Sequence, residues 1–385
     1  MHPGDRADPQ ALRALVRDDA VHRDVYVDAE LFALEMDRLW ARTWVYLGHD
    51  SQVPHRGDRI TVDIARRPVT LRRADDGSVQ AVAAGSPLAG VAVRRGFVFV
   101  RLAGDGPSFD DWAGPMGAVI DAIADRSPHG ALQVVGAPIR SLVRANWKMY
   151  IENINDTVHP PATHQSANDA AGAVWAGQPA DAPKPMAIQQ LLPFGSGWTF
   201  FEAMGGRVLP HGHSVLGTQA SIHSAYDGLD GYAASLASAH GEARAREVLA
   251  FAPQNAVFYP SVSMKAMPQA IRVIRPLAVD RTLIEAWAFQ PVGAPEVLAR
   301  RALTYNRLVF SPMSVLAHDD LHVFETIQSA LRADGNPWVS LARGLRGVEP
   351  PGESAEVGGT DERLIRNQFQ AWVAAMAQPV KTGPR

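Results

Sequence analysis

The 385-residue chain contains no cysteine. It therefore cannot form a disulfide, use a thiolate nucleophile, build a cysteine-ligated zinc site or hold an iron–sulfur cluster through cysteine thiolates. The chain also lacks an excess of charge of either sign, because 37 Lys and Arg residues stand against 40 Asp and Glu residues, a net charge of −3. This near-balance of charge argues against a protein that binds nucleic acid or an anionic membrane through an overall positive charge.

Long apolar runs are absent as well. No run approaches the roughly 18 residues that a membrane-spanning helix needs. The N-terminal segment, MHPGDRADPQALRALVRDD, is polar and acidic, whereas a signal peptide begins with basic residues followed by apolar ones. We therefore expect a cytoplasmic protein that has neither a membrane nor a nucleic acid as a partner.

The N-terminal third of the chain changes from helical to strand-like character. Residues 8–40 are predicted to be helical, with Asp8 as N-cap and Pro9 at the first helical position. Residues 43–103 contain short β-rich runs separated by turn signals, ending in the alternating run GFVFVRL. The chain is thus expected to consist of a helical lead-in at 1–42, a small antiparallel β domain at 43–105 and a larger domain at 135–385.

The larger domain mixes helices with strands. NWKMYIENINDTVH is predicted to be a helix that stops at Pro160-Pro161. Residues 187–292 read as alternating strands and turns, WTFFEAM among them, with one helical stretch at 229–251. Helices are predicted again at 295–331 and 361–377. The expected fold class is α+β, in which a small β domain precedes a larger domain with an antiparallel sheet.

Asp156-x2-His159-x4-His164 is the clearest candidate metal motif. Two neutral imidazoles and a carboxylate, with open positions opposite them, suit an Fe(II) ion that binds oxygen beside a substrate. Residues five apart on an unbroken helix point about 140° away from one another. We therefore expect the prolines at 160 and 161 to break the helix, so that His164 turns back toward His159.

Two places in the sequence offer the carboxylate ligand. Asp156 is close to the histidines, but three residues before His159 it can equally accept a hydrogen bond from an imidazole N–H. Asp319 and Asp320 begin a predicted helix far downstream, where an acidic pair can also serve as an N-cap. The residue types and spacings leave these alternatives open.

Three motifs carry a resemblance to a known family. ENxNDTxHxxxxH at 152–164, HDDLxxFExxQ at 318–328 and RNQFxAW at 366–372 resemble the catalytic domain of the Rieske-type non-haem iron aromatic-ring-hydroxylating oxygenases, large (alpha) subunit. Upstream, LFALEMDRLWARTWVYLGHDSQVPHRGD and GFVFVRL are similar to the entry and exit of that family's iron–sulfur domain. The resemblance implies a helix-grip (START-like) catalytic domain at 135–385 and a truncated Rieske-like domain at 43–105.

The resemblance also implies roles for individual residues. His159 and His164 match the iron-ligating histidines, and Asp320 matches the carboxylate ligand. Asp156 matches the bridging aspartate, which in the family bonds a ligand histidine and links the iron to a neighbouring subunit's cluster. Residues of the same motif that could line the site are Asn153 and Asn155.

Other polar residues near these motifs have alternative interpretations. His318 and His322 flank the ligand carboxylate, and we interpret them as helix-surface or packing residues. The strand residues Arg272 and Arg275 could meet an acidic substrate, although strand arginines are more often simply solvated.

The chain departs from the family pattern in its iron–sulfur domain. The family holds a [2Fe–2S] cluster with a Cys-x-His loop and a Cys-x2-His loop. Here only 14 residues lie between Ala81 and Gly96, and they include neither Cys nor His. We therefore expect one mononuclear Fe(II) and no [2Fe–2S] cluster on this chain.

The leading hypothesis is a non-haem Fe(II) oxygenase subunit that hydroxylates or demethylates an aromatic or cyclic substrate with O2. Its electrons would come from the Rieske cluster of a separate partner subunit, supplied by a reductase or ferredoxin, within a trimeric or hexameric hetero-oligomeric ring. Two alternatives remain. One is a catalytically silent structural subunit of such an oligomer, and the other is a metal-free ligand-binding protein of the helix-grip type.

Overall fold

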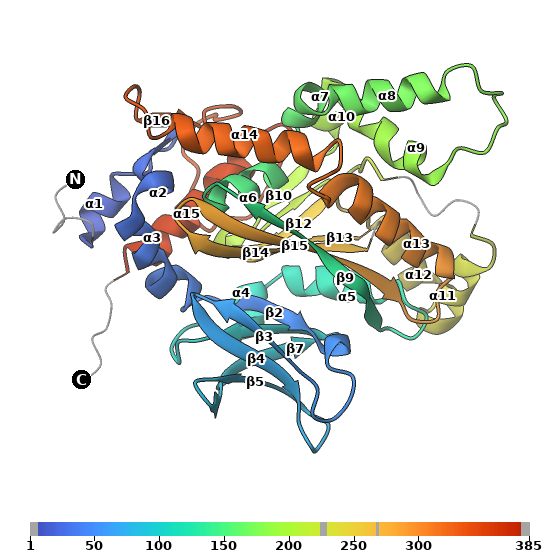
Figure 1. Ribbon diagram of the computed structural model, residues 1–385, viewed down its shortest axis with the longest axis horizontal. Helices are drawn as coiled ribbons and strands as arrows, with labels where there is room; N and C mark the ends of the chain where they lie inside the picture. The colour runs from blue at the N-terminus through green and yellow to red at the C-terminus, as the bar shows by residue number, and fades with distance from the viewer. Residues whose placement is uncertain (1–6, 224–228, 267–268, 379–385) are drawn as a thin grey trace.

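An eight-stranded antiparallel sheet forms the centre of the molecule, with two smaller sheets below it (Figure 1). This computed structural model describes residues 7–223, 229–266 and 269–378. In spatial order, the large sheet contains β17 (Ala355–Val357), β10 (Gly206–Val208), β11 (Ser214–Leu216), β12 (Asn255–Phe258), β13 (Val262–Lys265), β14 (Ala270–Ala278), β15 (Arg281–Pro291) and β9 (Leu132–Val143). The predicted α+β class with an antiparallel sheet is confirmed.

The small sheets are built from residues 45–101. One contains β2 (Val45–His49), β8 (Phe97–Arg101) and β7 (Gly90–Arg94), and the other contains β3 (Arg59–Ile64), β4 (Arg67–Arg73), β5 (Val79–Ala83) and β6 (Ser86–Pro87). Several hairpins close through two-residue turns with positive φ at both positions, such as Ala84-Gly85 and Arg95-Gly96, a geometry that matches the twist of paired strands. Strands and tight turns therefore account for most of the short segment between Ala81 and Gly96.

The N-terminal lead-in is not continuously helical. It contains α1 (Pro9–Arg13), β1 (Ala20–His22), α2 (Asp24–Val27), α3 (Ala29–Glu35) and a π-helical turn at Met36–Trp40. Asp8 does cap α1, because its carboxylate accepts the N–H of Ala11 at 2.8 Å. The interruption is β1, which pairs with the distant β16 (Trp338–Ser340). Local periodicity carries no information about such a long-range pairing.

The helices that follow the small sheets in the chain pack mainly over the large sheet. In chain order they are α4 (Phe109–Ala113), α5 (Met116–Ala124), α6 (Trp147–Asn155), α7 (His159–Thr163), α8 (Gln165–Trp175), α9 (Met186–Leu191), α10 (Trp198–Ala203), α11 (Tyr232–His240), α12 (Glu242–Ala250), α13 (Glu296–Tyr305), α14 (Ala317–Ala330) and α15 (Arg363–Met376). In Figure 1, α14 lies across the top, next to α6, while α4 and α5 lie between the large sheet and the small ones.

One predicted strand is wrong. WTFFEAM forms α10, preceded by α9 and a 3-10 turn at Leu192–Gly195. Its buried side chains, Phe201 and Met204, are three residues apart, whereas Trp198 is 54 % exposed. A period of three to four is helical, but a short run of large apolar residues fits either structure when it is read alone.

The buried Glu35 joins the lead-in to the larger domain. Its carboxylate accepts hydrogen bonds from the indole N–H groups of Trp147 at 2.8 Å and Trp372 at 2.7 Å, and from the ammonium group of Lys148. Glu35 is 0 % and Lys148 1 % exposed. Helices α3, α6 and α15 are therefore tied together at one buried ion pair.

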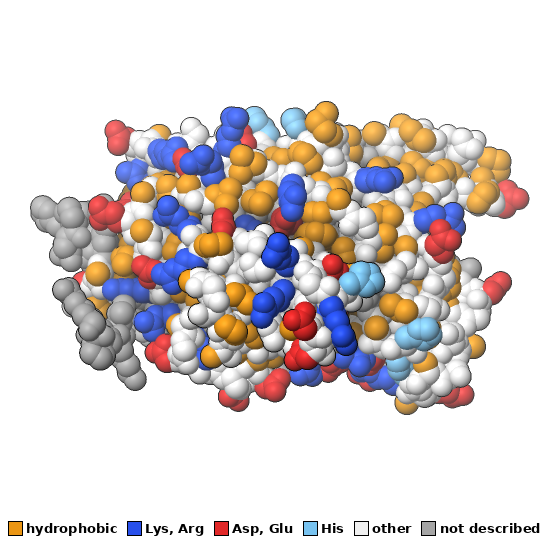
Figure 2. Space-filling model, turned by 60° about the horizontal axis from the view of Figure 1, so that its bottom comes forward, with side chains coloured by type: hydrophobic (Ala, Val, Ile, Leu, Met, Phe, Trp, Pro, Cys, Tyr) orange, Lys and Arg blue, Asp and Glu red, His pale blue; other side chains and the backbone are white. Residues whose placement is uncertain are grey.

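The surface is mixed in character. On the face that carries the small sheets, positive, negative and apolar side chains are interspersed (Figure 2), in keeping with the near-balance of charge in the sequence. Among the described residues, no helix has the length and apolar character needed to cross a bilayer.

Candidate metal centre

The fold brings together His159, His164 and Asp320, which are up to 161 positions apart in the chain. One candidate ligand atom from each lies within 4.8 Å of the others, and no other such group occurs among the described residues. Asp320 Oδ1 is 3.3 Å from His164 Nε2 and 3.9 Å from His159 Nε2. Two imidazoles and one carboxylate thus converge on one point.

The chain path between the two histidines differs from the prediction. Helix α6 already ends at Asn155, and Pro160 and Pro161 lie in the first turn of α7. Proline is accepted there because first-turn N–H groups have no partner within the helix. His164 ends α7 with a φ of −105° and a ψ of 16°, and this departure from helical geometry lets its ring approach that of His159, with 5.4 Å between centroids.

Asp156 orients His159. Its Oδ2 atom accepts the backbone N–H groups of Val158 at 2.9 Å and His159 at 2.7 Å, and it lies 3.0 Å from His159 Nδ1. An ionised carboxylate can only accept hydrogen bonds, so the imidazole proton belongs on Nδ1. The lone pair of Nε2 therefore faces the site, where the amide nitrogen of Asn153 lies 3.0 Å away, and Nε2 is the atom that would coordinate a metal ion.

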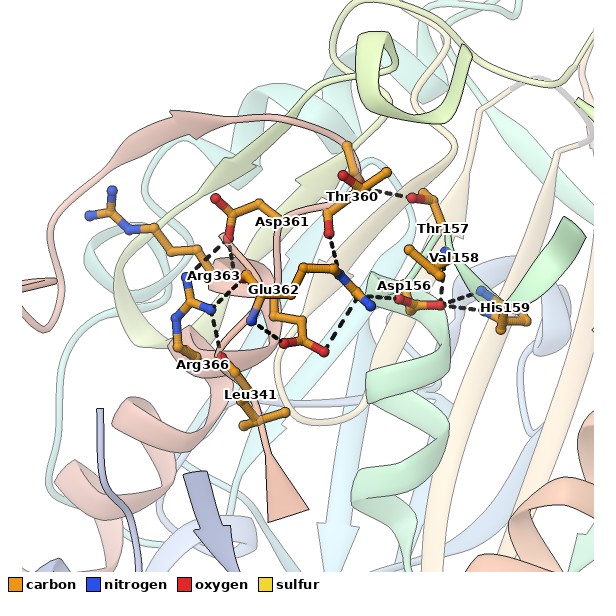
Figure 3. A network of polar contacts seen from close by, with 12 residues as sticks. Asp156, Thr157, Val158, His159, Leu341, Thr360, Asp361, Glu362, Arg363 and Arg366 are labelled. Atoms are coloured by element: carbon orange, nitrogen blue, oxygen red, sulfur yellow. Dashed lines mark hydrogen bonds and ion pairs between the residues drawn. The ribbon is translucent and has the colours of Figure 1, made fainter. Parts of the chain in front are cut away.

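The other carboxylate oxygen of Asp156 is held by a residue from the C-terminal part of the chain. The guanidinium group of Arg343 donates to Asp156 Oδ1 at 2.7 Å and to the Thr360 carbonyl at 2.7 Å, and lies 3.5 Å from Glu362. Asp156 is thus one end of a charged network that continues to Glu362 (Figure 3). Burial opposes ionisation, but hydrogen bonds from His159 and the charge of Arg343 hold the pKa of Asp156 below its usual value.

Sequence reasoning missed Arg343. No local pattern marks it, since its partner Asp156 is 187 positions away. The sequence also left open whether Asp319 has any role besides helix capping. The Oδ2 atom of that carboxylate lies 3.9 Å from His164 Nδ1, and neither of these two atoms has a hydrogen-bond partner among the described residues. The acidic pair does not cap α14, because Ser314 Oγ accepts the first-turn N–H of Ala317 at 3.0 Å.

The remaining predicted residues are placed as follows. Asn153 lies inside the site, with its amide nitrogen 3.0 Å from His159 Nε2 and 3.2 Å from Asp320 Oδ1. Asn155 lies outside it, buried and accepting a hydrogen bond from Ser214 at 2.7 Å. His318 and His322 are exposed on α14.

The two strand arginines occupy opposite faces of β14. Arg275 points away from the metal centre and donates to the carbonyl groups of Tyr46 at 2.8 Å and Leu47 at 3.1 Å. Arg272 lines the same cavity as the candidate ligands. Neither is solvated, because Arg272 is 5 % and Arg275 6 % exposed.

The metal centre separates two hollows. The inner cavity lies between the large sheet and α6, α7 and α14, and its wall is largely apolar, with Ile154, Phe194, Phe201, Met204, Leu216, Ile284, Val309, Phe310, Leu316, Leu321 and Phe324. An outer groove is bordered by Val323, Ile327, Leu331 and Leu341. Asn153, Asp156, His159 and Asp320 line both hollows.

A further carboxylic acid, Glu152, borders the outer groove. Desolvation raises the pKa of Glu152 to about 8, so this side chain is mainly protonated and neutral at pH 7. The groove therefore gains no negative charge from Glu152. Its lining is mainly apolar, and Asp156, His159, Asp320 and Glu362 also border it.

The donor set of the centre fits a transition metal. Two imidazole nitrogens and one carboxylate, on one side of a cavity, leave the opposite coordination positions to small molecules. The hydrogen bond from the protonated Nδ1 of His159 to Asp156 is the arrangement expected of an imidazole that coordinates through Nε2, and Nε2 of His164 also faces Asp320. The cavity beyond them supplies an apolar space for an organic substrate.

Comparisons with known proteins agree with this geometry. Residues 129–378 match the family model "Ring hydroxylating alpha subunit (catalytic domain)". The subunit alpha of toluate 1,2-dioxygenase from Pseudomonas putida is 26 % identical, over 93 % of this chain and 91 % of that protein. Naphthalene 1,2-dioxygenase from a Rhodococcus species superposes with a TM-score of 0.76 at 19 % identity, covering 99 % of this chain and all of that one.

A second solved structure is that of a quaternary ammonium Rieske monooxygenase, described for its inter-subunit electron transfer. It has a TM-score of 0.58 at 14 % identity and covers 98 % of this chain and 99 % of that one. At these low identities the two structural matches demonstrate a shared fold. The match to the family model covers more than half of the chain.

Proposed function

The chain belongs to the ring-hydroxylating alpha subunit family, whose members are oxidoreductases, and we propose that His159, His164 and Asp320 hold a mononuclear Fe(II) ion. With this iron, the subunit hydroxylates or demethylates an aromatic or cyclic substrate in the inner cavity, using O2. The observation that carries the proposal is the convergence of the three ligand atoms within 4.8 Å at the wall of that cavity. In this proposal residues 43–105 are a truncated Rieske-like domain and 135–385 the catalytic domain.

The residues of the centre have distinct tasks. An iron held by His159, His164 and Asp320 would supply oxygen activation. Asp156 keeps the proton of His159 on Nδ1 and fixes the ring, while Arg343 holds Asp156 in place. The apolar wall of the inner cavity binds the ring of the substrate and excludes water.

Electrons must reach the iron from outside this chain. The chain has no cysteine with which to hold a Rieske cluster. The outer groove offers an entry route, since its lining is mainly apolar and Asp156 and His159 border both this groove and the inner cavity. We assign this groove to a Rieske-bearing partner subunit, itself supplied by a reductase or ferredoxin, in a trimeric or hexameric hetero-oligomeric ring.

Iron analysis tests the metal centre. After anaerobic loading with Fe(II) and removal of excess metal, the chain is expected to retain one iron and no acid-labile sulfide. The variant His159→Ala is expected to retain less than a tenth of that iron, because changes even to the partners of ligand residues lower metal affinity about 10–100-fold. His322→Ala, exposed on α14, is the matched control and should load fully. An iron-free wild-type chain, or equal loading of His159→Ala, would instead favour the metal-free ligand-binding alternative.

Copurification tests whether the outer groove binds the Rieske-bearing partner subunit. Val323 and Ile327 of α14 are 37 % and 43 % exposed at its edge. Ile327→Arg places a charge in an interface that would otherwise be apolar, so we expect its affinity for the Rieske-bearing subunit to fall at least about tenfold. Val174→Arg on α8, where Val174 is 65 % exposed, provides the control. Equal capture of the partner by both variants would refute the assignment of this groove.

A further inference from the structure

Two buried cations line the inner cavity together with the candidate iron ligands. Lys265 ends β13 and Arg272 lies on the neighbouring β14, and they are 3 % and 5 % exposed. Both belong to the wall of the cavity that contains His159, His164 and Asp320. A cavity that needed only to bind a neutral ring would have no use for two positive charges at its inner wall.

Neither cation has an ion pair with a carboxylate in the part of the chain that the structure describes. Lys265 donates to the carbonyl oxygen of Gln254 at 2.8 Å. Arg272 donates to the side chains of Asn255 and Ser263, both uncharged, and its Nε has no hydrogen-bond partner. The positive charges are therefore bonded only to neutral groups.

Two other buried cations of this protein have a carboxylate partner. Lys148 is paired with Glu35, and Arg275, three residues along the strand from Arg272, lies 3.6 Å from Glu285. A third, Arg101, is 8 % exposed and donates instead to the backbone carbonyl groups of Ala103 and Pro107. Lys265 and Arg272 differ from these three because they line one cavity together.

An uncompensated pair of this kind is costly. Burying an ion is unfavourable unless an opposite charge offsets the lost hydration. Burial, reinforced by the charge of Arg272, lowers the pKa of Lys265 well below its ordinary value. Arginine cannot relieve the cost in this way, because its guanidinium group stays protonated in proteins. An anion in the cavity would remove the penalty for both residues.

Tyr150 relates the cations to the metal centre. The guanidinium carbon of Arg272 lies 5.8 Å from the ring centroid of Tyr150 and 5.0 Å from that of Phe310. Tyr150, Asp320 and both cations line the same cavity. One ligand of modest size can therefore meet the cations and the metal centre at once.

We propose that Lys265 and Arg272 bind an anionic substituent of the substrate, a carboxylate or a sulfonate, while its ring faces the metal centre. This inference rests on the proposed function, and it defines the substrate class as cyclic acids. The guanidinium group offers paired N–H donors that match such an oxyanion, and the ammonium group adds a point charge.

Binding to the purified full-length chain tests this inference without turnover. Titration calorimetry would compare benzoate, benzenesulfonate and the neutral benzamide, which share one ring. At least one of the two anions is expected to bind at least ten times more tightly than benzamide. The tighter of the two identifies the substituent as carboxylate or sulfonate. Equal binding of all three, or binding of none, would overturn the proposal.

Variants separate a ligand-binding role from a structural one. Lys265→Met and Arg272→Gln are each expected to weaken anion binding at least tenfold while leaving benzamide binding unchanged. Lys265→Met should not lower the melting temperature, because it removes a buried charge and keeps the length of the side chain. Arg281→Gln, exposed on β15, is the control. An unchanged anion preference in Lys265→Met would refute the assignment, whether or not Arg272→Gln folds.

The two proposals can fail separately. Selective anion binding by a chain that does not retain iron would refute the oxygenase function and leave the anion site standing. A chain that loads one iron but does not distinguish benzoate or benzenesulfonate from benzamide would refute only the anion site.

Discussion

Replacing Asp320 with alanine is expected to lower turnover of the complex with its Rieske-bearing partner by more than about a hundredfold. Asp320 supplies the only carboxylate that lies within 4.8 Å of both imidazoles in the described residues, and loss of a ligand should exceed the 10–100-fold cost of losing an outer partner. Assembly should persist, because Asp320 lies beside the outer groove and contributes no apolar surface to it. Oxygen consumption coupled to product formation, with gel filtration of the complex, provides the measurement.

This variant also decides between catalytic and structural subunits. If the chain only completes a ring around active partners, Asp320→Ala should leave turnover at its full level, and the silent-subunit alternative would stand. His318→Ala, exposed two residues earlier on α14, controls for a general disturbance of the helix. Turnover that falls equally in both variants would point to damage to the helix rather than loss of a ligand.

Replacing Glu35 with alanine is expected to lower the free energy of unfolding by about 3–5 kcal/mol, the cost of leaving a buried ion without its partner. The variant leaves the ammonium group of Lys148 and the indole N–H groups of Trp147 and Trp372 buried without their hydrogen-bond acceptor. Burial already lowers the pKa of Lys148, and Glu35 opposes this shift. Denaturant titration followed by tryptophan fluorescence measures the loss.

A double variant isolates the role of charge. Glu35→Gln combined with Lys148→Met removes both charges and keeps an oxygen acceptor for one of the two indole N–H groups, so part of the lost stability should return. Asp37→Ala serves as the comparison, because Asp37 is 68 % exposed in its pair with Arg67 and surface pairs contribute only about 0–1 kcal/mol. A Glu35→Ala variant as stable as Asp37→Ala would show that the buried pair is not structurally important.

The sequence was most informative where its motifs are compact. Asp156, His159 and His164 lie within nine residues, and the structure places all of them in one site. The path between them was predicted incorrectly. Proline was read as the end of a helix, whereas Pro160 and Pro161 lie in the first turn of the next one, because proline is acceptable at a helix start and unfavourable only in its interior.

Residues that act through distant partners could not be identified in this way. Nothing around Arg343 indicates that it holds Asp156, 187 positions away. Arg272 and Arg275 look alike in the sequence, but three residues along a strand place them on opposite faces of the sheet. One enters the cavity and the other approaches Glu285. The face of the sheet that lines the cavity is determined by where the helices pack, and the sequence of the strand does not show this.

The sequence by itself determined the α+β class, the family resemblance, the candidate ligand types and the absence of cysteine, because composition and short motifs are local properties. The tertiary structure decided that Asp320, to which the resemblance had pointed, lies beside the histidines. It alone decided that Arg343 restrains Asp156, and that Lys265 and Arg272 share a cavity and form no ion pair with a carboxylate in the described residues. These are contacts between segments far apart in the chain. Burial and charge balance arise only when such segments pack, so the sites that depend on them cannot be read from local pattern.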